Sequence, residues 1–319
     1  MSTVDQSGGW IPYADRTFDQ QVMSDSFKNA TAPFGAVNRG LGDLPARALL
    51  YDLEVKATGK LCNRIWQMEG SCVGAAAARS YVQSMCGDIA HRNTQEQVKD
   101  LFPWTTWGKG RQLGGMNRRG AGSYGAAQAK AGEQYGMNAA DNPKLPQPTN
   151  KNGWLVWSAK IELDYSVPKQ WPVPEEELAK EANEHQVMHV ARITKWDELL
   201  QAFAQGYGVT IASMFGTRPT VRGDVLIGDH TLSWPHQMSL SGYITHPQHG
   251  ILIAVDNQWG PNAHPECPTL SPMGVRGSFW ITQKTVTKLL SQGSVEVYAH
   301  GDTEDWPVRQ LDWDSMWMG

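Results

Sequence analysis

The sequence predicts an α+β fold, with helices in the first half of the chain and antiparallel strands in the second half. Residues 70–85 carry small side chains on nearly every face, which suits a helix buried between two packed layers, and we expect it to stop at Gly87. Further helices are expected at 123–135, 175–182 and 196–205. Short apolar runs alternate as strands do, and they cover 187–193, 209–213, 238–244, 251–255, 278–281 and 294–299.

The composition divides the chain into four segments. Residues 1–43 are polar, broken by Gly and Pro and without a sustained period, so we interpret them as an N-terminal arm. Residues 44–145 form a helical lobe and 146–302 a β-rich lobe, with an irregular proline-rich stretch around their junction. Residues 303–319 form an acidic tail with three tryptophans, Trp306, Trp313 and Trp317. We interpret the tail as a cap on the second lobe, although such tryptophans also suit a docking peptide.

Bulk composition excludes several classes of function. Lys and Arg number 28 against 32 Asp and Glu, a net charge of −4, so no basic surface for nucleic acid is expected. No apolar run is long enough to span a membrane, and the N-terminus lacks a secretion signal, so we expect a cytoplasmic protein. The four cysteines (Cys62, Cys72, Cys86, Cys267) form neither a disulfide framework nor a CxxC pair, so no metal or other cofactor is expected.

Cys72 is the strongest candidate for chemistry. The small residues Gly70 and Ser71 deliver it to the first turn of a helix, where unpaired N–H groups and the helix dipole stabilise a thiolate. A lone cysteine there is more often structural. Here, however, His236 lies in a strand-like run and Asn257 opens an Asn-Gln-Trp-Gly segment. A thiol, an imidazole and a group that orients the imidazole are what thiol-dependent amide hydrolysis requires.

These segments resemble the papain-like cysteine peptidases, in a divergent form typical of bacteria and bacteriophages. The motifs that carry the resemblance, which covers most of residues 44–300, are Gly70-Ser71-Cys72, Gly115-Met116-Asn117-Arg118-Arg119, the run from His236 to Tyr243, and Asn257-Gln258-Trp259-Gly260. The resemblance implies a two-lobed fold, with a helical left lobe and an antiparallel, β-barrel-like right lobe. It places Cys72 opposite His236 across a cleft.

The resemblance also implies roles for individual residues. Cys72 would be the nucleophile, His236 the acid and base, and Asn257 the group that orients His236. Gln67 would help the Cys72 backbone N–H to bind the oxyanion, although it lies one residue closer to Cys72 than in the family pattern. Trp259 would shield the hydrogen bond between His236 and Asn257 from water.

At several positions the sequence departs from the family pattern, and each departure predicts a difference from the family. Arg118 and Arg119 replace glycines that line the substrate cleft, so they would narrow it or select acidic residues. Glu69 and Met116 stand where the family has a disulfide, which fits a reducing compartment. The 43 residues before the first lobe are too few, and too irregular, to match the family's inhibitory propeptide.

Three functions are compatible with these residues. The leading hypothesis is cysteine-dependent hydrolysis of a peptide or related amide bond in a peptide or protein substrate. A second is a papain-fold structural protein, such as a virion or assembly component of a bacteriophage, with weak or no catalysis and with a protein partner bound through the arm and the tail. A third is acyl transfer or crosslinking, because the same Cys–His pair can deliver an acyl group to an amine. Neither nucleic acid nor a membrane is expected as a partner.

Overall fold

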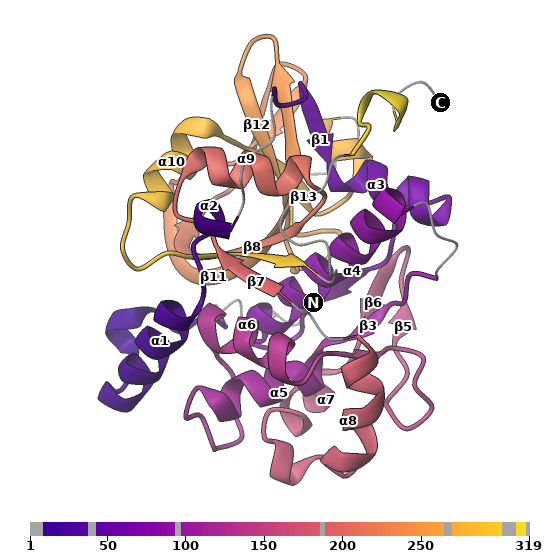
Figure 1. Ribbon diagram of the computed structural model, residues 1–319, viewed down its shortest axis with the longest axis vertical. Coiled ribbons are helices and arrows are strands. Elements are labelled where there is room, and N and C mark those ends of the chain that lie inside the picture. Colours follow the sequence, from indigo (N-terminus) through magenta and orange to yellow (C-terminus); the bar gives the residue numbers. More distant parts are fainter. Residues whose placement is uncertain are drawn as a thin grey trace.

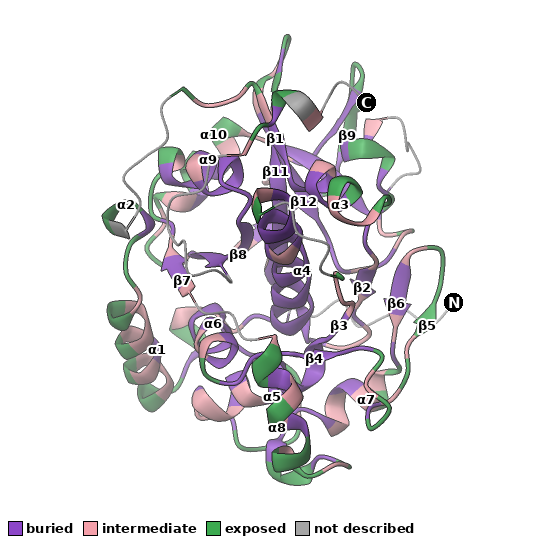
Figure 2. Ribbon diagram, turned by 45° about the vertical axis from the view of Figure 1, so that its right-hand side comes forward, coloured by how far each residue is buried: buried purple, intermediate pink, exposed green. Residues whose placement is uncertain are grey.

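The computed structural model describes residues 9–37, 43–92, 97–185, 189–264, 270–301 and 311–316. A helical part and a β-rich part pack on the two sides of one long helix, α4 (Cys72–Arg92), as Figures 1 and 2 show. Figure 2 shows α4 buried along most of its length. Its run of alanines lets both parts approach the helix axis closely, as the sequence predicted for a helix between two layers.

The β-rich part is one sheet. Its path in the described residues is β7-β14-β8-β11-β12-β13-β10-β9, with β1 also pairing with β11. The path ends at β7 on one side and at β9 on the other, so the sheet is open and not a closed barrel. All neighbours are antiparallel except β10 and β13, which are parallel. The strands are β1 (Arg47–Leu49), β7 (His189–Arg192), β8 (Gly208–Gly216), β9 (Thr220–Arg222), β10 (Val225–Ile227), β11 (Leu232–His246), β12 (Gly250–Asp256), β13 (Ser278–Thr282) and β14 (Glu296–Gly301). Two helices, α9 (Trp196–Ala204) and α10 (Gln283–Leu290), pack against it.

The helical part is built from short elements around the other side of α4 (Figure 1). Its helices are α3 (Leu50–Thr58), α5 (Pro103–Leu113), α6 (Gly125–Gln134), α7 (Ala159–Asp164) and α8 (Glu175–Glu184). Its strands are β2 (Arg64–Trp66), β3 (Leu101–Phe102), β4 (Asn138–Ala139), β5 (Thr149–Asn150) and β6 (Trp154–Val156). The sequence division assigned residues from 146 onward to the β-rich lobe. The structure instead pairs β6 with β2 and packs α8 on β4, so this segment lies with the helices up to about residue 185.

The long helix also differs from its predicted end. It does not stop at Gly87 but continues to Arg92. Gly87 serves close packing, because a Cβ atom on Gly206 would lie 3.3 Å from the Gly87 Cα atom. The glycine therefore lets another backbone approach the helix.

The N-terminal arm contains more regular structure than its composition suggested. It holds α1 (Phe18–Ala30) and α2 (Phe34–Val37) after a single 3₁₀ turn, η1 (Tyr13–Asp15). A capping box starts α1, in which Thr17 accepts from the Gln20 backbone N–H and the Gln20 side chain accepts from the Thr17 N–H. The Thr-x-x-Gln pattern was the signal in the sequence that could have predicted this helix.

A buried carboxylate anchors the arm to the sheet. Arg16 lies 2.9 Å from Glu296 of β14, and both side chains are fully buried. The indole N–H of Trp10 and the backbone N–H of Gly125 donate to the same carboxylate, at 2.8 and 3.0 Å. The body of the protein itself therefore holds the arm in place.

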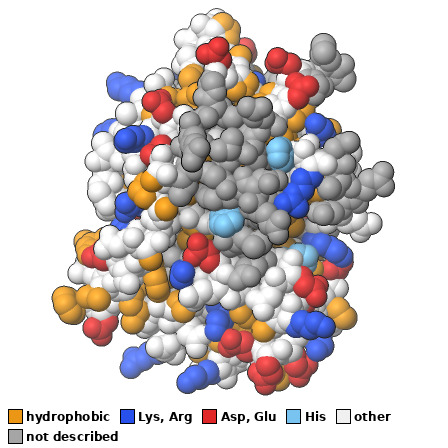
Figure 3. Space-filling view, in the orientation of Figure 1, with side chains coloured by type: hydrophobic (Ala, Val, Ile, Leu, Met, Phe, Trp, Pro, Cys, Tyr) orange, Lys and Arg blue, Asp and Glu red, His pale blue; other side chains and the backbone are white. Residues whose placement is uncertain are grey.

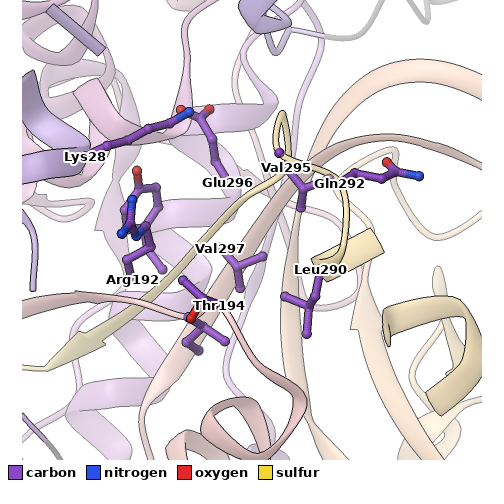
Figure 4. A pocket seen from close by; sticks show the side chains of 11 residues that line it. Lys28, Arg192, Thr194, Leu290, Gln292, Val295, Glu296 and Val297 are labelled. Atoms are coloured by element: carbon purple, nitrogen blue, oxygen red, sulfur yellow. The ribbon is translucent and has the colours of Figure 1, made fainter. Parts of the chain in front are cut away.

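Helix α1 lies at the edge of the molecule. Phe18 and Val22 are 78% and 52% exposed, and Figure 3 shows hydrophobic side chains over this helix. The same view shows acidic and basic side chains interspersed, without a large patch of one sign on this face. Between α1 and the sheet, a pocket of about 160 Å³ is lined by Lys28, Arg192 and Glu296, among others (Figure 4).

The tail is described only in part. Trp313 is buried and its indole N–H donates to the Ala204 carbonyl oxygen at 2.7 Å, as expected for a cap on the second lobe. Trp306 and Trp317, together with Cys267, lie outside the described residues. None of the described helices has the length and apolar character needed to cross a bilayer.

A buried ionic cluster joins the helical part to the sheet. Arg79 of α4 donates to Asp256 of β12 at 2.7 Å and also pairs with Glu54 of α3. Tyr51 donates to the same Asp256 at 2.6 Å. Burial raises the pKa of Asp256, but the charges of Arg79 and Arg64 outweigh burial and hold this pKa below its usual value. The cluster is thus a charged cross-link between three elements.

Replacing Arg79 with Leu is expected to lower the free energy of unfolding by about 3–5 kcal/mol, because it leaves Glu54 and Asp256 buried without their main cation. Urea denaturation measures the change. Lys144→Ala is the control, since the Lys144–Glu177 pair is half exposed and its loss should cost about 0–1 kcal/mol. Equal losses for the two variants would contradict the role of the cluster.

Candidate active site

Cys72 is the first residue of α4 and is completely buried. Its Sγ atom lies 3.3 Å from the backbone nitrogen of Gln237, which donates to it. Gln237 follows His236 on β11, and α4 packs against this strand. The structure therefore brings the cysteine and the histidine segment together from positions 164 residues apart in the sequence.

His236 is held by Asn257 and Trp259. The Nε2 atom of His236 lies 3.0 Å from Asn257 Oδ1, and the Trp259 ring stacks on the imidazole with centroids 4.6 Å apart. Because the amide oxygen can only accept, Nε2 carries the proton, and neutral His236 presents the bare Nδ1 as a base. Nδ1 is buried and has no hydrogen-bond partner within the described residues, so the thiol–imidazole hydrogen bond is not formed here.

A second histidine completes this arrangement and was missed by the sequence analysis. His264 Nε2 lies 3.0 Å from Asn257 Nδ2, so the amide nitrogen donates to it. This bond fixes the amide with its oxygen toward His236. His264 lies seven residues after Asn257 in an irregular stretch, with no motif to mark it, so only the fold reveals the contact.

Gln67 lies at the expected place before the nucleophile, but it is already engaged. Its side-chain amide nitrogen donates to the Glu69 carbonyl oxygen at 2.9 Å, and its backbone N–H donates to Gln258 at 2.9 Å. One amide hydrogen of Gln67 remains for an oxyanion. Its role as an oxyanion donor remains a prediction.

Burial controls the protonation of the pair. Burial raises the pKa of Cys72 to about 12, although backbone N–H groups of Gln237, Gly9 and Val73 offset part of the shift. Burial lowers the pKa of His236 to about 4, although the hydrogen bond that His236 donates to Asn257 opposes this shift. At neutral pH the pair is therefore a neutral thiol and a neutral imidazole. The expected thiolate at the helix start is not present in this state, because desolvation outweighs the helix N-terminus.

The arm contacts the thiol, because the backbone N–H of Gly9 donates to Cys72. Ser123 donates to the Gly9 carbonyl oxygen at 2.8 Å, and Ile11 donates to the Ser123 carbonyl oxygen at 2.7 Å, so the arm runs as an extended segment beside the loop at 122–123. A Cβ atom on Gly9 would lie 2.1 Å from the Gly70 carbonyl carbon. Gly9 therefore packs directly against the turn that leads into Cys72. The sequence analysis did not predict this contact, because a single glycine in an irregular segment has no motif.

Arg118 and Arg119 are exposed on the loop between α5 and α6. Arg119 pairs with Asp164 at 2.9 Å, while Arg118 makes no ion pair within the described residues. Buried Arg111, which the sequence analysis did not single out, holds the loop by donating to the carbonyl oxygens of Arg118 and Ala121 at 2.8 and 2.7 Å. That these two arginines contact substrate remains a prediction.

Acidification is expected to destabilise the fold between about pH 6.5 and 4. Burial and repulsion by His236 lower the pKa of His264 from 6.5 to about 4. The unfolded chain therefore takes up a proton at a higher pH than the folded chain does. The stabilisation is complete above pH 6.5 and is lost as the pH falls toward 4.

Urea denaturation at pH 7 and pH 4.5 tests this effect. His264→Gln should reduce the loss of unfolding free energy between the two pH values by roughly 1–3 kcal/mol. The partly exposed His185, replaced by Gln, provides the control. A loss as large in His264→Gln as in the wild type would refute the assignment.

The fold of the chain is similar to that of several solved structures, although its sequence matches no family model. No family profile matches it, and no curated protein sequence matches it. The crystal structure of xylellain, a cysteine protease from Xylella fastidiosa, matches with a TM-score of 0.59 and 15% identity, over 93% of this chain and 96% of xylellain. Procathepsin B from Trypanosoma congolense matches with a TM-score of 0.53 and 10% identity, over 93% and 87% of the two chains. Procathepsin L 3 from the Tenebrio molitor larval midgut matches with a TM-score of 0.51 and 11% identity, over 92% and 82%.

Proposed function

We propose that this chain, which has the papain-like fold, is a cysteine-dependent hydrolase of peptide or related amide bonds that its own N-terminal arm holds latent. One observation carries the proposal. The Cys72 sulfur lies 3.3 Å from the backbone nitrogen that follows His236, while Asn257 fixes the His236 ring from the opposite nitrogen. This arrangement of nucleophile, base and orienting group is the one that thiol catalysis needs.

The reaction follows from these positions once the arm has moved aside. The Cys72 thiol gives its proton to His236 Nδ1, and the sulfur attacks the carbonyl carbon of the substrate. The backbone N–H of Cys72 and the free amide hydrogen of Gln67 stabilise the oxyanion. His236 then protonates the leaving amine, which leaves a thioester on Cys72. Water gives a proton to His236, attacks the thioester, and releases the acid and the thiol.

Movement of the arm is the step that would control activity. Gly9 has no side chain and accepts one backbone hydrogen bond from Ser123, whereas Trp10 and Arg16 are both bound to the buried Glu296 carboxylate. Gly9 would therefore be easier to displace than the arm from Trp10 onward. Rehydration of the cleft would lower the pKa of Cys72 and raise that of His236, which favours the reactive ion pair.

A second candidate function is a papain-fold structural protein without turnover. The covered, neutral thiol favours it. However, the described anchors of both termini, Trp10, Arg16 and Trp313, are buried within the chain itself. They are thus not available for a partner, which weakens the case for docking through these residues. Transfer of the acyl group to an amine, the third candidate, would differ from hydrolysis only in what attacks the thioester.

Gly9→Ala is expected to expose the nucleophile. The added methyl group would meet the Gly70 backbone at 2.1 Å, so the arm must leave the turn. Alkylation of Cys72 by iodoacetamide, followed by mass spectrometry, should become at least about tenfold faster as the thiol regains water and an ordinary pKa.

Gly293→Ala is the matched control, because a methyl group there meets nothing within 4 Å. If Cys72 in the Gly9→Ala variant were alkylated as slowly as in the wild type, the arm would not be the barrier.

Peptide cleavage separates the three functions. In the Gly9→Ala background, a mixture of peptides should be hydrolysed, and adding Cys72→Ala should abolish hydrolysis. Acidic peptides should be cut faster than neutral ones, and Arg118→Ala should remove that preference.

Mass spectrometry of the products in the presence of an amine distinguishes free acids from amides, and thus hydrolysis from acyl transfer. Fast alkylation of Cys72 without any turnover would instead support the structural protein.

A further inference from the structure

The loop that leads into Cys72 is held by a residue far away in the sequence. Glu162 of α7 accepts from the Met68 backbone N–H at 2.7 Å through one carboxyl oxygen. Its other oxygen accepts from the Glu69 backbone N–H at 3.0 Å and from the Ser71 hydroxyl at 2.5 Å. Three of the four residues between Gln67 and Cys72 are therefore bonded to a single side chain.

The fold delivers Glu162 to this loop through paired strands. Strand β2 runs directly into Gln67, and β6 pairs with β2 in parallel. After β6, Ser158 caps α7 by accepting from the Ile161 N–H, and Glu162 follows on the first turn. The pairing of β2 with β6 thus fixes the position of Glu162 relative to the nucleophile loop.

The burial of the Glu162 carboxyl group requires a physical explanation. Glu162 is completely buried and makes no ion pair in the described part of the chain. Burial raises the pKa of Glu162 to about 8, against the hydrogen bonds from Ser71, Met68 and Glu69, and the charge of Glu69 raises it further. A residue that only filled space would be apolar, because burying a carboxyl group is unfavourable unless donors satisfy it.

The hydrogen bonds of Glu162 also influence the positions of the expected oxyanion donors. By holding the Glu69 backbone, Glu162 fixes the Glu69 carbonyl oxygen, which accepts from the Gln67 side chain at 2.9 Å and from the Ser71 N–H at 2.8 Å. Both expected oxyanion donors, the Gln67 amide and the Cys72 N–H, thus depend on the same loop conformation.

We propose that Glu162 is a positioning residue, whose carboxyl group holds the loop 67–71 and thereby places the oxyanion donors and Cys72. Glu69 and Met116 stand where the resemblance to the papain-like peptidases would place a disulfide to this loop. The hydrogen bonds of Glu162 supply the missing restraint. The expected effect of Glu162 on the turnover rate rests on the proposed hydrolase function. Its effect on the conformation of the loop 67–71 does not.

Glu162→Gln tests the proposal. The glutamine has an NH2 group in place of one carboxyl oxygen, and this group cannot accept hydrogen bonds from the N–H and O–H groups that surround Glu162. Hydrogen exchange of the Met68, Glu69 and Cys72 amides, measured by NMR on the full chain, should become roughly ten- to hundredfold faster. In the Gly9→Ala background, kcat should fall at least about tenfold while KM changes less than about twofold, since misplaced oxyanion donors weaken only the transition state.

Asp164→Asn is the matched control on the same helix, since its partly exposed carboxylate pairs with Lys160 and Arg119 and not with the loop 67–71 in the described part of the chain. Exchange rates in Glu162→Gln equal to those of this control would overturn the proposal. If the Gly9→Ala protein shows no turnover at all, the hydrolase function fails, and amide exchange still decides whether Glu162 holds the loop.

A second variant covers the case in which Glu162→Gln does not fold. Ser71→Ala removes one donor of the three and leaves Glu162 in place. It should speed exchange of the Glu69 amide roughly three- to tenfold and lower kcat by a similar factor. Unchanged exchange and unchanged kcat in this variant would equally overturn the proposal.

Discussion

The buried ion pair between Arg79 and Asp256 is the contact on which the site depends. Arg79 lies two turns after Cys72 on α4, and Asp256 directly precedes Asn257. The pair therefore ties the helix that carries Cys72 to the strand that leads to Asn257. Its cost in desolvation is high, but three elements share the cluster, and the positions of the candidate catalytic residues depend on it.

Buried acidic side chains cross-link distant segments of the molecule. Glu54 joins α3 to α4, Glu162 joins α7 to the nucleophile loop, and Glu296 joins the arm to the sheet. The cysteines that the structure describes, Cys62, Cys72 and Cys86, are all free thiols. Each buried acid gathers donors from segments far apart in sequence, which gives a directional restraint that apolar packing lacks.

Burial determines the protonation state of the Cys72 thiol and outweighs the effect of its position at the start of α4. The start of α4 favours a thiolate, yet complete burial keeps Cys72 neutral and leaves His236 unprotonated. Under the proposed function, the same residues would be inert while Gly9 lies against the thiol and reactive once it has moved. The proposed change in activity would come from the access of water to Cys72 and His236, which changes their protonation states.

The sequence by itself determined the α+β class, the start of the helix at Cys72, and the strands that carry His236 and lead to Asn257. It also named Cys72, His236 and Asn257 as candidate catalytic residues. Local patterns suffice to predict these features, because hydrophobic periodicity and short motifs depend only on residues that are close in the sequence. Only the tertiary structure decided that Glu162 holds the nucleophile loop, that His264 orients the amide, and that the arm covers the thiol. These are contacts between segments that are distant in sequence or lack any motif, and hydrogen bonds to backbone groups leave no recognisable pattern of side chains.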